Sequence, residues 1–184
     1  MNRMNPIKRM TMAAVCAALC VVLPIAFHSI PDAGSVFLPM HIPVLICGMI
    51  CGWPYGLLCG LMGPVLSSAL TGMPPVAYLP AMMVECGTYG LVSGLMLKAI
   101  RTKSTYADLY IALVTAMLAG RIVSGIAKAL IFTPGMAMSA WVAASFVTAL
   151  PGIVIQLVFL PSVVFTLMKA RVIPQRYAKG KLTA

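Results

Sequence analysis

MMVECGTYG, residues 82–90, lies inside an apolar run that extends from about Val76 to Leu97. Its carboxylate, Glu85, is one of only three acidic side chains in the chain. An ionisable side chain near the centre of a bilayer costs at least ~2.5–3.5 kcal/mol, so it usually faces a cavity or a partner. Glu85 therefore marks a candidate functional site, provided that this stretch spans a membrane.

The composition places the stretch in a membrane. Of the 184 residues, 61% are hydrophobic and 9% are charged, whereas soluble domains carry about 25% charged residues. The sequence lacks the regular alternation of an outer-membrane barrel, so the predicted fold class is an all-α integral membrane protein. At about 20 residues per span, the length predicts about six transmembrane helices in one domain, residues 1–184, without a soluble domain.

Six apolar segments are the predicted spans. They extend over about residues 10–27, 40–51, 55–70, 76–97, 107–132 and 139–168. Asp108 is a favourable acid near the start of the fifth segment because it complements the helix dipole. The last segment is too long for one straight span, and Pro151-Gly152 is expected to break or bend it.

The net charge of +10 is predicted to orient the chain and not to bind nucleic acid. Every Lys and Arg except Arg121 and Lys128 lies in residues 1–9, 98–103 or 169–184, beside the apolar runs. Because basic segments stay in the cytoplasm, both termini and the short basic tails, residues 1–9 and 169–184, are predicted to be cytoplasmic. Arg121 and Lys128 have no such topological explanation.

The six cysteines all lie in apolar runs, which argues against a disulfide framework. Cys16/Cys20 and Cys47/Cys51 have the i, i+4 spacing that could offer thiolate pairs to a soft metal. Packing of small apolar side chains is the favoured interpretation, and no metal site is predicted.

Small residues recur at a four-residue spacing, which lets membrane helices approach closely. They are Ala13, Ala14, Ala17 and Ala18 in the first span, and Gly48, Gly52, Gly56 and Gly60 further along. For the glycines, packing within the chain is the favoured interpretation. For the alanines, the spacing alone favours packing and a partner-facing role equally.

Several polar side chains are predicted to lie at a similar depth. At a rise of ~1.5 Å per residue, Glu85 lies ~13 Å from the outer end of its span and Arg121 ~20 Å from the inner end of its own. In a core of ~30 Å these depths are close, and Gln156 falls near them. Lys128 shares a helix face with Arg121 and lies nearer the outside.

These side chains form the predicted substrate-binding site. Its members are Glu85, Tyr89, Arg121, Lys128, Gln156 and His41. Such a site combines polar and aromatic groups around a small molecule, and two cations against one acid favour a ligand with negative charge or strong acceptors. A structural alternative stays open, in which Glu85 and Arg121 merely pair and hold two helices together.

Sequence motifs for catalysis are absent. The chain has no HExxH, no GxSxG and no Walker A lysine, and neither catalysis nor nucleotide hydrolysis is predicted. It also lacks a convincing internal repeat, which autonomous carriers usually have. A binding subunit that obtains energy from partner proteins fits these absences.

An ordered set of segments resembles the S components of energy-coupling factor (ECF) vitamin transporters. The segments are AAVCAA (13–18), HIPVLICGMICG (41–52), PVLSSALTGMP (64–74), ECGTYGLVSG (85–94), GRIVSG (120–125) and PGIVIQLVFLP (151–161). Cys16 is a mild departure inside the alanine-rich signature. The resemblance covers nearly the whole chain.

The resemblance implies a multi-pass subunit of the bacterial cytoplasmic membrane that binds a vitamin or vitamin precursor. Pantothenate and a B6 vitamer are candidates. Ala13, Ala14, Ala17 and Ala18 would dock on a transmembrane T subunit that works with two cytoplasmic ATPases. ATP would be used by these partners, with no cofactor bound by this chain, and residues 28–41 would form a lid. The competing class is a small membrane scaffold or regulator with a structural Glu85–Arg121 pair.

Overall fold

Helices form every element in the part of the chain that the structure describes. This structure is a computed structural model, and it describes residues 4–26, 36–132 and 137–174. The α-helices are α1 (Pro6–Ala26), α3 (His41–Cys51), α4 (Trp53–Thr71), α5 (Leu79–Ala99), α6 (Thr105–Ala127), α7 (Met138–Val142) and α8 (Leu150–Lys169). Two π-helical segments, η1 (Lys128–Phe132) and η2 (Ala143–Thr148), follow α6 and α7.

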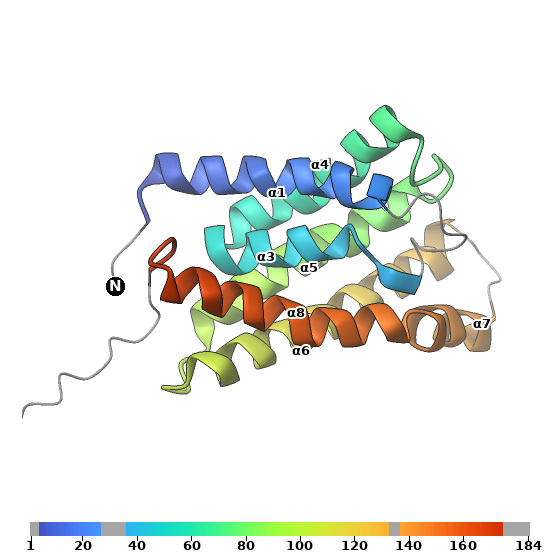
Figure 1. Ribbon diagram of the computed structural model, residues 1–184. Helices are drawn as coiled ribbons and strands as arrows, with labels where there is room; N and C mark the ends of the chain where they lie inside the picture. Colours follow the sequence, from blue (N-terminus) through green and yellow to red (C-terminus); the bar gives the residue numbers. More distant parts are fainter. Residues whose placement is uncertain (1–3, 27–35, 133–136, 175–184) are drawn as a thin grey trace, which may run out of the picture.

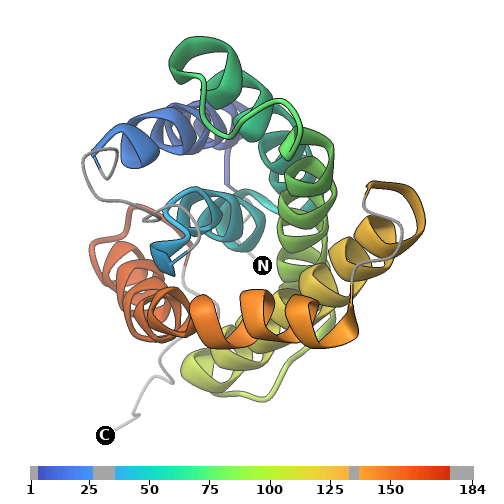
Figure 2. The same cartoon turned by 90° about the vertical axis from the view of Figure 1, so that its right-hand side faces the viewer.

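The short helix α3 lies at the centre of the bundle. It contacts α1, α4, α5 and α8, which surround it when the bundle is viewed along its length (Figure 2). Eight of its 11 residues are buried. A helix that is apolar on every side is expected in a protein core, and this position brings its first residue, His41, into the interior.

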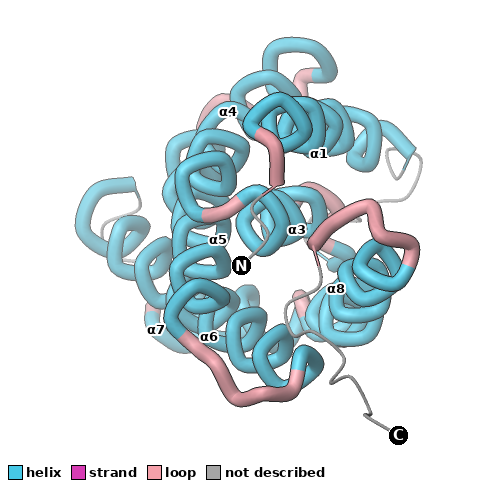
Figure 3. The backbone as a smooth tube through the Cα atoms, turned by 90° about the vertical axis from the view of Figure 1, so that its left-hand side faces the viewer, coloured by secondary structure: helices cyan, strands magenta, loops and turns pink. Residues whose placement is uncertain are grey.

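The basic segments gather at one end of the bundle. The start of α1, the connection between α5 and α6 and the end of α8 all lie at the left in Figure 1, and Figure 3 views this end. The loop before α5, together with α7, lies at the other end (Figure 1). This arrangement agrees with the charge pattern from which cytoplasmic termini were predicted, while the orientation itself stays a prediction.

Three helical segments are long and apolar enough to cross a membrane. They are Pro6–Ala26, Thr105–Phe132 and Leu150–Lys169. The 19 residues of α4 and the 21 of α5 give lengths of about 28–32 Å, close to a bilayer core of ~30 Å. These two helices are less apolar because they carry glycine, serine and Glu85. The count of six spans stays a prediction.

Glycines allow α3, α4 and α5 to pack backbone against backbone. A Cβ built at Gly56 or Gly90 would overlap the backbone of the other helix, and one at Gly60 would overlap the backbone of Cys86. A Cβ at Gly48 would likewise meet the carbonyl of Gly90. The predicted internal packing is confirmed for these members of the glycine series, whereas Gly52 makes the turn between α3 and α4 with a φ of 96°.

Two boundaries confirm the prediction from sequence and one corrects it. Asp108 lies in the first turn of α6 and accepts hydrogen bonds from the backbone N (2.8 Å) and Oγ1 (2.7 Å) of Thr102. The last apolar segment breaks at Ala149, and Pro151 falls in the first turn of α8. By contrast, α1 begins at Pro6. The first helix therefore begins earlier than predicted, while the cytoplasmic place of residues 1–9 stays a prediction. Residues 175–184 lie outside the described ranges.

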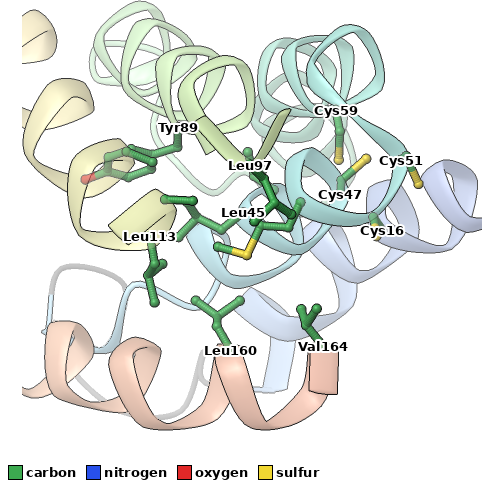
Figure 4. Packing of buried hydrophobic residues seen from close by; sticks show 14 of the residues in the cluster. Cys16, Leu45, Cys47, Cys51, Cys59, Tyr89, Leu97, Leu113, Leu160 and Val164 are labelled. Carbon is green, nitrogen blue, oxygen red and sulfur yellow. The ribbon is translucent and has the colours of Figure 1, made fainter. Parts of the chain in front are cut away.

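All six cysteines are buried, and none of them forms a disulfide. Cys16, Cys47, Cys51 and Cys59 gather where α1, α3 and α4 meet (Figure 4), and the Sγ atoms of Cys20 and Cys59 are 3.9 Å apart. Within the described ranges, no group of three or more His, Cys, Asp and Glu side chains could hold a metal ion. The cysteines belong to the hydrophobic core cluster.

Candidate functional site

Glu85 is buried in the middle of α5 and accepts hydrogen bonds on both carboxylate oxygens. Tyr89, one helical turn later, donates its hydroxyl to Oε1 at 2.9 Å. Ser124 of α6 lies 3.3 Å from Oε2. A buried carboxylate needs such donors to offset the water that it loses, so Glu85 joins α5 to α6 through a hydrogen-bonded contact.

Two nitrogen-bearing side chains approach the same carboxylate from other elements. Nε2 of His41, the first residue of α3, is 3.7 Å from Oε1, and Nζ of Lys128, the first residue of η1, is 3.9 Å from Oε2. The rings of His41 and Tyr89 meet edge-on, with centroids 5.0 Å apart. The structure thus brings together four of the six predicted site residues: Glu85, Tyr89, His41 and Lys128.

The ring of Tyr89 reaches this position because the residue of α6 that it lies against, Gly120, has no side chain. Tyr89 is almost fully buried, and its ring extends from α5 toward α6 (Figure 4). A Cβ built at Gly120 would overlap that ring. The glycine therefore allows the phenol to lie against the α6 backbone, with its hydroxyl directed to Glu85.

Arg121 is buried and contacts η2. Its Nη1 donates to the carbonyl oxygen of Ser145 in η2, and its guanidinium lies over the ring of Phe146 at 5.6 Å. Within the described ranges the cation beside Glu85 is Lys128, at 3.9 Å, and the imidazole of His41 lies 3.7 Å away. The Glu85–Arg121 pair that the sequence left open is therefore not formed.

Ser124 explains this difference and was missed in the sequence. It lies three residues after Arg121 and four before Lys128, the spacing of neighbours on one helix face. Ser124 and Lys128 face Glu85, so their side chains take the place expected for the guanidinium. That spacing is the signal in the sequence, although a lone serine in an apolar helix is a weak one.

Trp141 and Phe146 also belong to this region and have no polar signature in the sequence. Their rings stand edge-to-face, 5.9 Å apart. The indole packs on α6, since a Cβ built at Gly125 would be 2.5 Å from its Cε2. Phe146 lies in the π-helical segment η2, and π-helical turns occur frequently at functional sites.

Gln156 joins the site only indirectly. It is buried in α8, and its Nε2 lies 3.5 Å from the carbonyl oxygen of Leu38. The same carbonyl accepts a 3.1 Å hydrogen bond from the backbone N of His41. Gln156 thus supports the chain that enters α3, and its hydrogen bond is made there and not to Glu85.

Several buried polar atoms of this region have no hydrogen-bond partner among the described residues. They are Nε and Nη2 of Arg121, both ring nitrogens of His41, and Nε1 of Trp141. A buried donor without a partner costs about 1–3 kcal/mol. Since the Glu85 oxygens already accept bonds from the chain, the remaining donors of Arg121 and Trp141 fit an acceptor-rich molecule.

The four alanines of α1 divide between two faces. Ala13 and Ala17 are partly buried and pack against the hydrophobic core. Ala14 and Ala18 are exposed on the outside of the bundle. A partner could therefore reach the second pair, while the first contributes to packing within the chain.

The predicted lid, residues 28–41, is described only in part, because residues 28–35 lie outside the described ranges. The segment from Leu38 to His41 is buried. Just before it, the backbone of Val36 and Phe37 lies so close to α8 that a Cβ at Gly152 would meet it. This part of the loop is packed between α8 and the start of α3.

Comparison with known proteins gives one match. The family model described as "ECF transporter, substrate-specific component" matches residues 8–171. No curated protein and no solved structure matches the chain significantly. The matched range includes every residue of the site described above.

Proposed function

Because this chain belongs to the family of substrate-specific components of ECF transporters, we propose that it captures a water-soluble vitamin or vitamin precursor outside the cell for ATP-driven uptake. The family assigns a membrane-embedded, substrate-binding subunit. The identity of the substrate, the binding residues and the partners are parts of the proposal.

The buried polar cluster around Glu85 is the observation that supports a small-molecule site. It draws side chains from α3, α5, α6 and η1, and it lies beside Arg121, whose guanidinium keeps two unpartnered nitrogens. Binding sites place a few polar groups of this kind among apolar and aromatic walls. Arg121 and Lys128 against Glu85 favour an anionic or acceptor-rich substrate, for which pantothenate and a B6 vitamer are candidates.

The proposed assembly comprises this chain, a transmembrane T subunit and two cytoplasmic ATPases. ATP is used by the ATPases, and this chain binds no cofactor and catalyses no reaction. It crosses the bacterial cytoplasmic membrane six times, with both termini in the cytoplasm. The gathering of basic segments at one end of the bundle supports this orientation (Figure 1).

A membrane scaffold or regulator is the competing function. Its sequence argument was a structural pair between Glu85 and Arg121, and these residues have different partners in the structure. No contact in the described ranges favours that function specifically, so transport is the better-supported proposal.

The proposal is tested with the full chain, purified in mild detergent from cells that also produce a T subunit and both ATPases. We expect the tagged chain to recover the three partners, and native mass spectrometry to detect a bound small molecule. In liposomes, uptake of that molecule should require ATP. Recovery of neither partners nor a small molecule would favour the scaffold.

The binding residues are tested with the identified molecule. Arg121→Ala and Lys128→Ala should each weaken its affinity, whereas Lys103→Ala, at the exposed α5–α6 connection, should not. Full affinity in both site variants would remove these cations from the proposed site.

A further inference from the structure

Only one of the three guanidinium nitrogens of Arg121 has a hydrogen-bond partner in the described ranges. Nη1 donates to the carbonyl oxygen of Ser145, while Nε and Nη2 have no partner in the described ranges. The side chain is only 4% exposed, so water is largely excluded from the two unpartnered nitrogens. An arginine held at one end, with the two donors of its other edge buried and unpartnered in the described ranges, is suited to a further acceptor.

The two unpartnered nitrogens form one edge of the guanidinium. The N–H groups of Nε and Nη2 on this edge point in nearly the same direction, at the spacing of two oxygens of a carboxylate or phosphate. Such pairs form two parallel, charge-assisted hydrogen bonds, which are stronger than neutral ones. A single neutral acceptor would satisfy only one of the two donors.

Glu85, which lies at a similar depth, does not bind the unpartnered edge of Arg121. Both oxygens of Glu85 already accept hydrogen bonds, from Tyr89 and Ser124, and both lie near the nitrogens of His41 and Lys128. Asp108 is at the start of α6, where it binds Thr102. Within the described ranges, therefore, neither acid meets Arg121, and an oxyanion on a bound molecule fits the two unpartnered donors.

The surroundings of Arg121 add a further donor and an apolar wall. Trp141 packs against Gly125, one helical turn after Arg121 on α6, and its Nε1 is buried without a partner. Phe146 lies under the guanidinium and meets Trp141 edge-to-face. Phe146 gives the guanidinium an apolar neighbour, and the indole N–H of Trp141 is a third unpartnered donor in this region.

We propose that the substrate carries a carboxylate or phosphate group that binds in a bidentate manner to the Nε–Nη2 edge of Arg121, beside Trp141. The oxyanion is the recognised group, and the neutral analogue of the same molecule is rejected. This inference rests on the proposed function of the chain as a substrate-binding subunit, and it adds the chemical class of the substrate and the atoms that recognise it.

Matched pairs of compounds test the inference on the full chain in detergent. The Trp53→Phe background leaves Trp141 as the only tryptophan, so its fluorescence reports binding at this region. The probes are pantothenate with its neutral alcohol pantothenol, and pyridoxal 5′-phosphate with pyridoxal. For at least one pair we expect the anion to bind at least 10-fold more tightly, which equals about 1.4 kcal/mol.

Variants of Arg121 distinguish the effect of its paired N–H groups from the effect of its positive charge. Arg121→Lys keeps the positive charge without the paired N–H groups and should lose most of the preference for the anion. Arg121→Ala should lose all of it. Arg101→Lys, at the exposed α5–α6 connection, is the matched control and should keep the preference. Melting curves confirm that the variants are folded.

A phospholipid headgroup offers the same oxyanion, so the titrations are repeated in nanodiscs of neutral and of anionic lipid. Equal affinities in both support a soluble substrate. Competition by anionic lipid alone, without binding of either anionic probe, overturns it.

The inference also fails if both members of each pair bind equally, if no anionic probe binds to the folded protein, or if a co-purified substrate contains no oxyanion. Recovery of the T subunit and the ATPases from the same preparation would then show that the proposed function survives the failure.

Discussion

Tyr89 donates a 2.9 Å hydrogen bond to Glu85, which lies one helical turn earlier on the same helix. The buried carboxylate therefore receives a hydrogen bond from a residue of the same helix, α5. Ser124, His41 and Lys128 then approach the carboxylate from α6, α3 and η1.

Tyr89→Phe removes this hydrogen bond and keeps the ring. Since a hydrogen bond to a charged group contributes about 1.5–3 kcal/mol, we expect a loss of stability of that order, measured by SDS-induced unfolding in mixed micelles. Tyr110→Phe, on the exposed face of α6, is the matched control and should change stability little. Equal stability of the two variants would show that the Tyr89 hydroxyl does not stabilise the carboxylate.

Gly120→Ala should displace Tyr89, because the added Cβ would overlap the phenol ring. We expect lower stability and weaker substrate binding, although alanine favours helix by about 1 kcal/mol over glycine. Gly87→Ala on α5 is the control, since its Cβ would meet the flexible end of Leu61 at 3.1 Å. A melting temperature of Gly120→Ala at or above that of Gly87→Ala would contradict the packing described here.

Glu85 and Lys128 should show energetic coupling. Glu85→Gln leaves Lys128 without its nearby carboxylate, and Lys128→Met leaves the carboxylate without a nearby ammonium, so each change alone should destabilise the fold. Residues in direct contact couple by about 0.5–3 kcal/mol. The double variant should therefore be more stable than the sum of the two single changes indicates, as a double-mutant cycle in mixed micelles can measure. Strict additivity would mean that the 3.9 Å ion pair contributes nothing to stability.

The sequence located the polar cluster but not its pairings. Glu85 was found because a carboxylate in an apolar run is expensive, and helix rise placed Arg121 at a similar depth. Depth says nothing about which side chain on a helix face meets the carboxylate. Ser124 and Lys128 lie on the same face as Arg121, and they are the two that approach Glu85. The partner of Arg121 is a backbone carbonyl of η2, a position that depends on how the last apolar segment folds back.

The break in the last apolar segment was predictable from the sequence, but the helix geometry before it was not. Pro151 predicted an interruption, since proline cannot continue a helix from its N-terminal side without losing a hydrogen bond. The six π-helical residues of η2 before the break are apolar or small, with no sequence signal for their geometry. Phe146 was missed for this reason, and Trp141 was missed because its place against Gly125 of α6 follows from how α7 and η2 fold back.

The two faces of the alanine-rich segment should respond differently to larger side chains. Ala14→Leu and Ala18→Leu fall on the exposed face and should leave the melting temperature of the isolated chain nearly unchanged. If the T subunit packs closely against this face, as small-residue helix interfaces do, the same changes should abolish recovery of the partner complex.

Ala13→Leu and Ala17→Leu fall on the side that packs against the core. Overpacking there typically costs about 1–3 kcal/mol, so they should lower the melting temperature of the isolated chain. Blue-native electrophoresis measures formation of the complex, and thermal melts measure the stability of the isolated chain. If the doubly substituted Ala14→Leu/Ala18→Leu chain still forms the complex fully, the docking surface lies elsewhere.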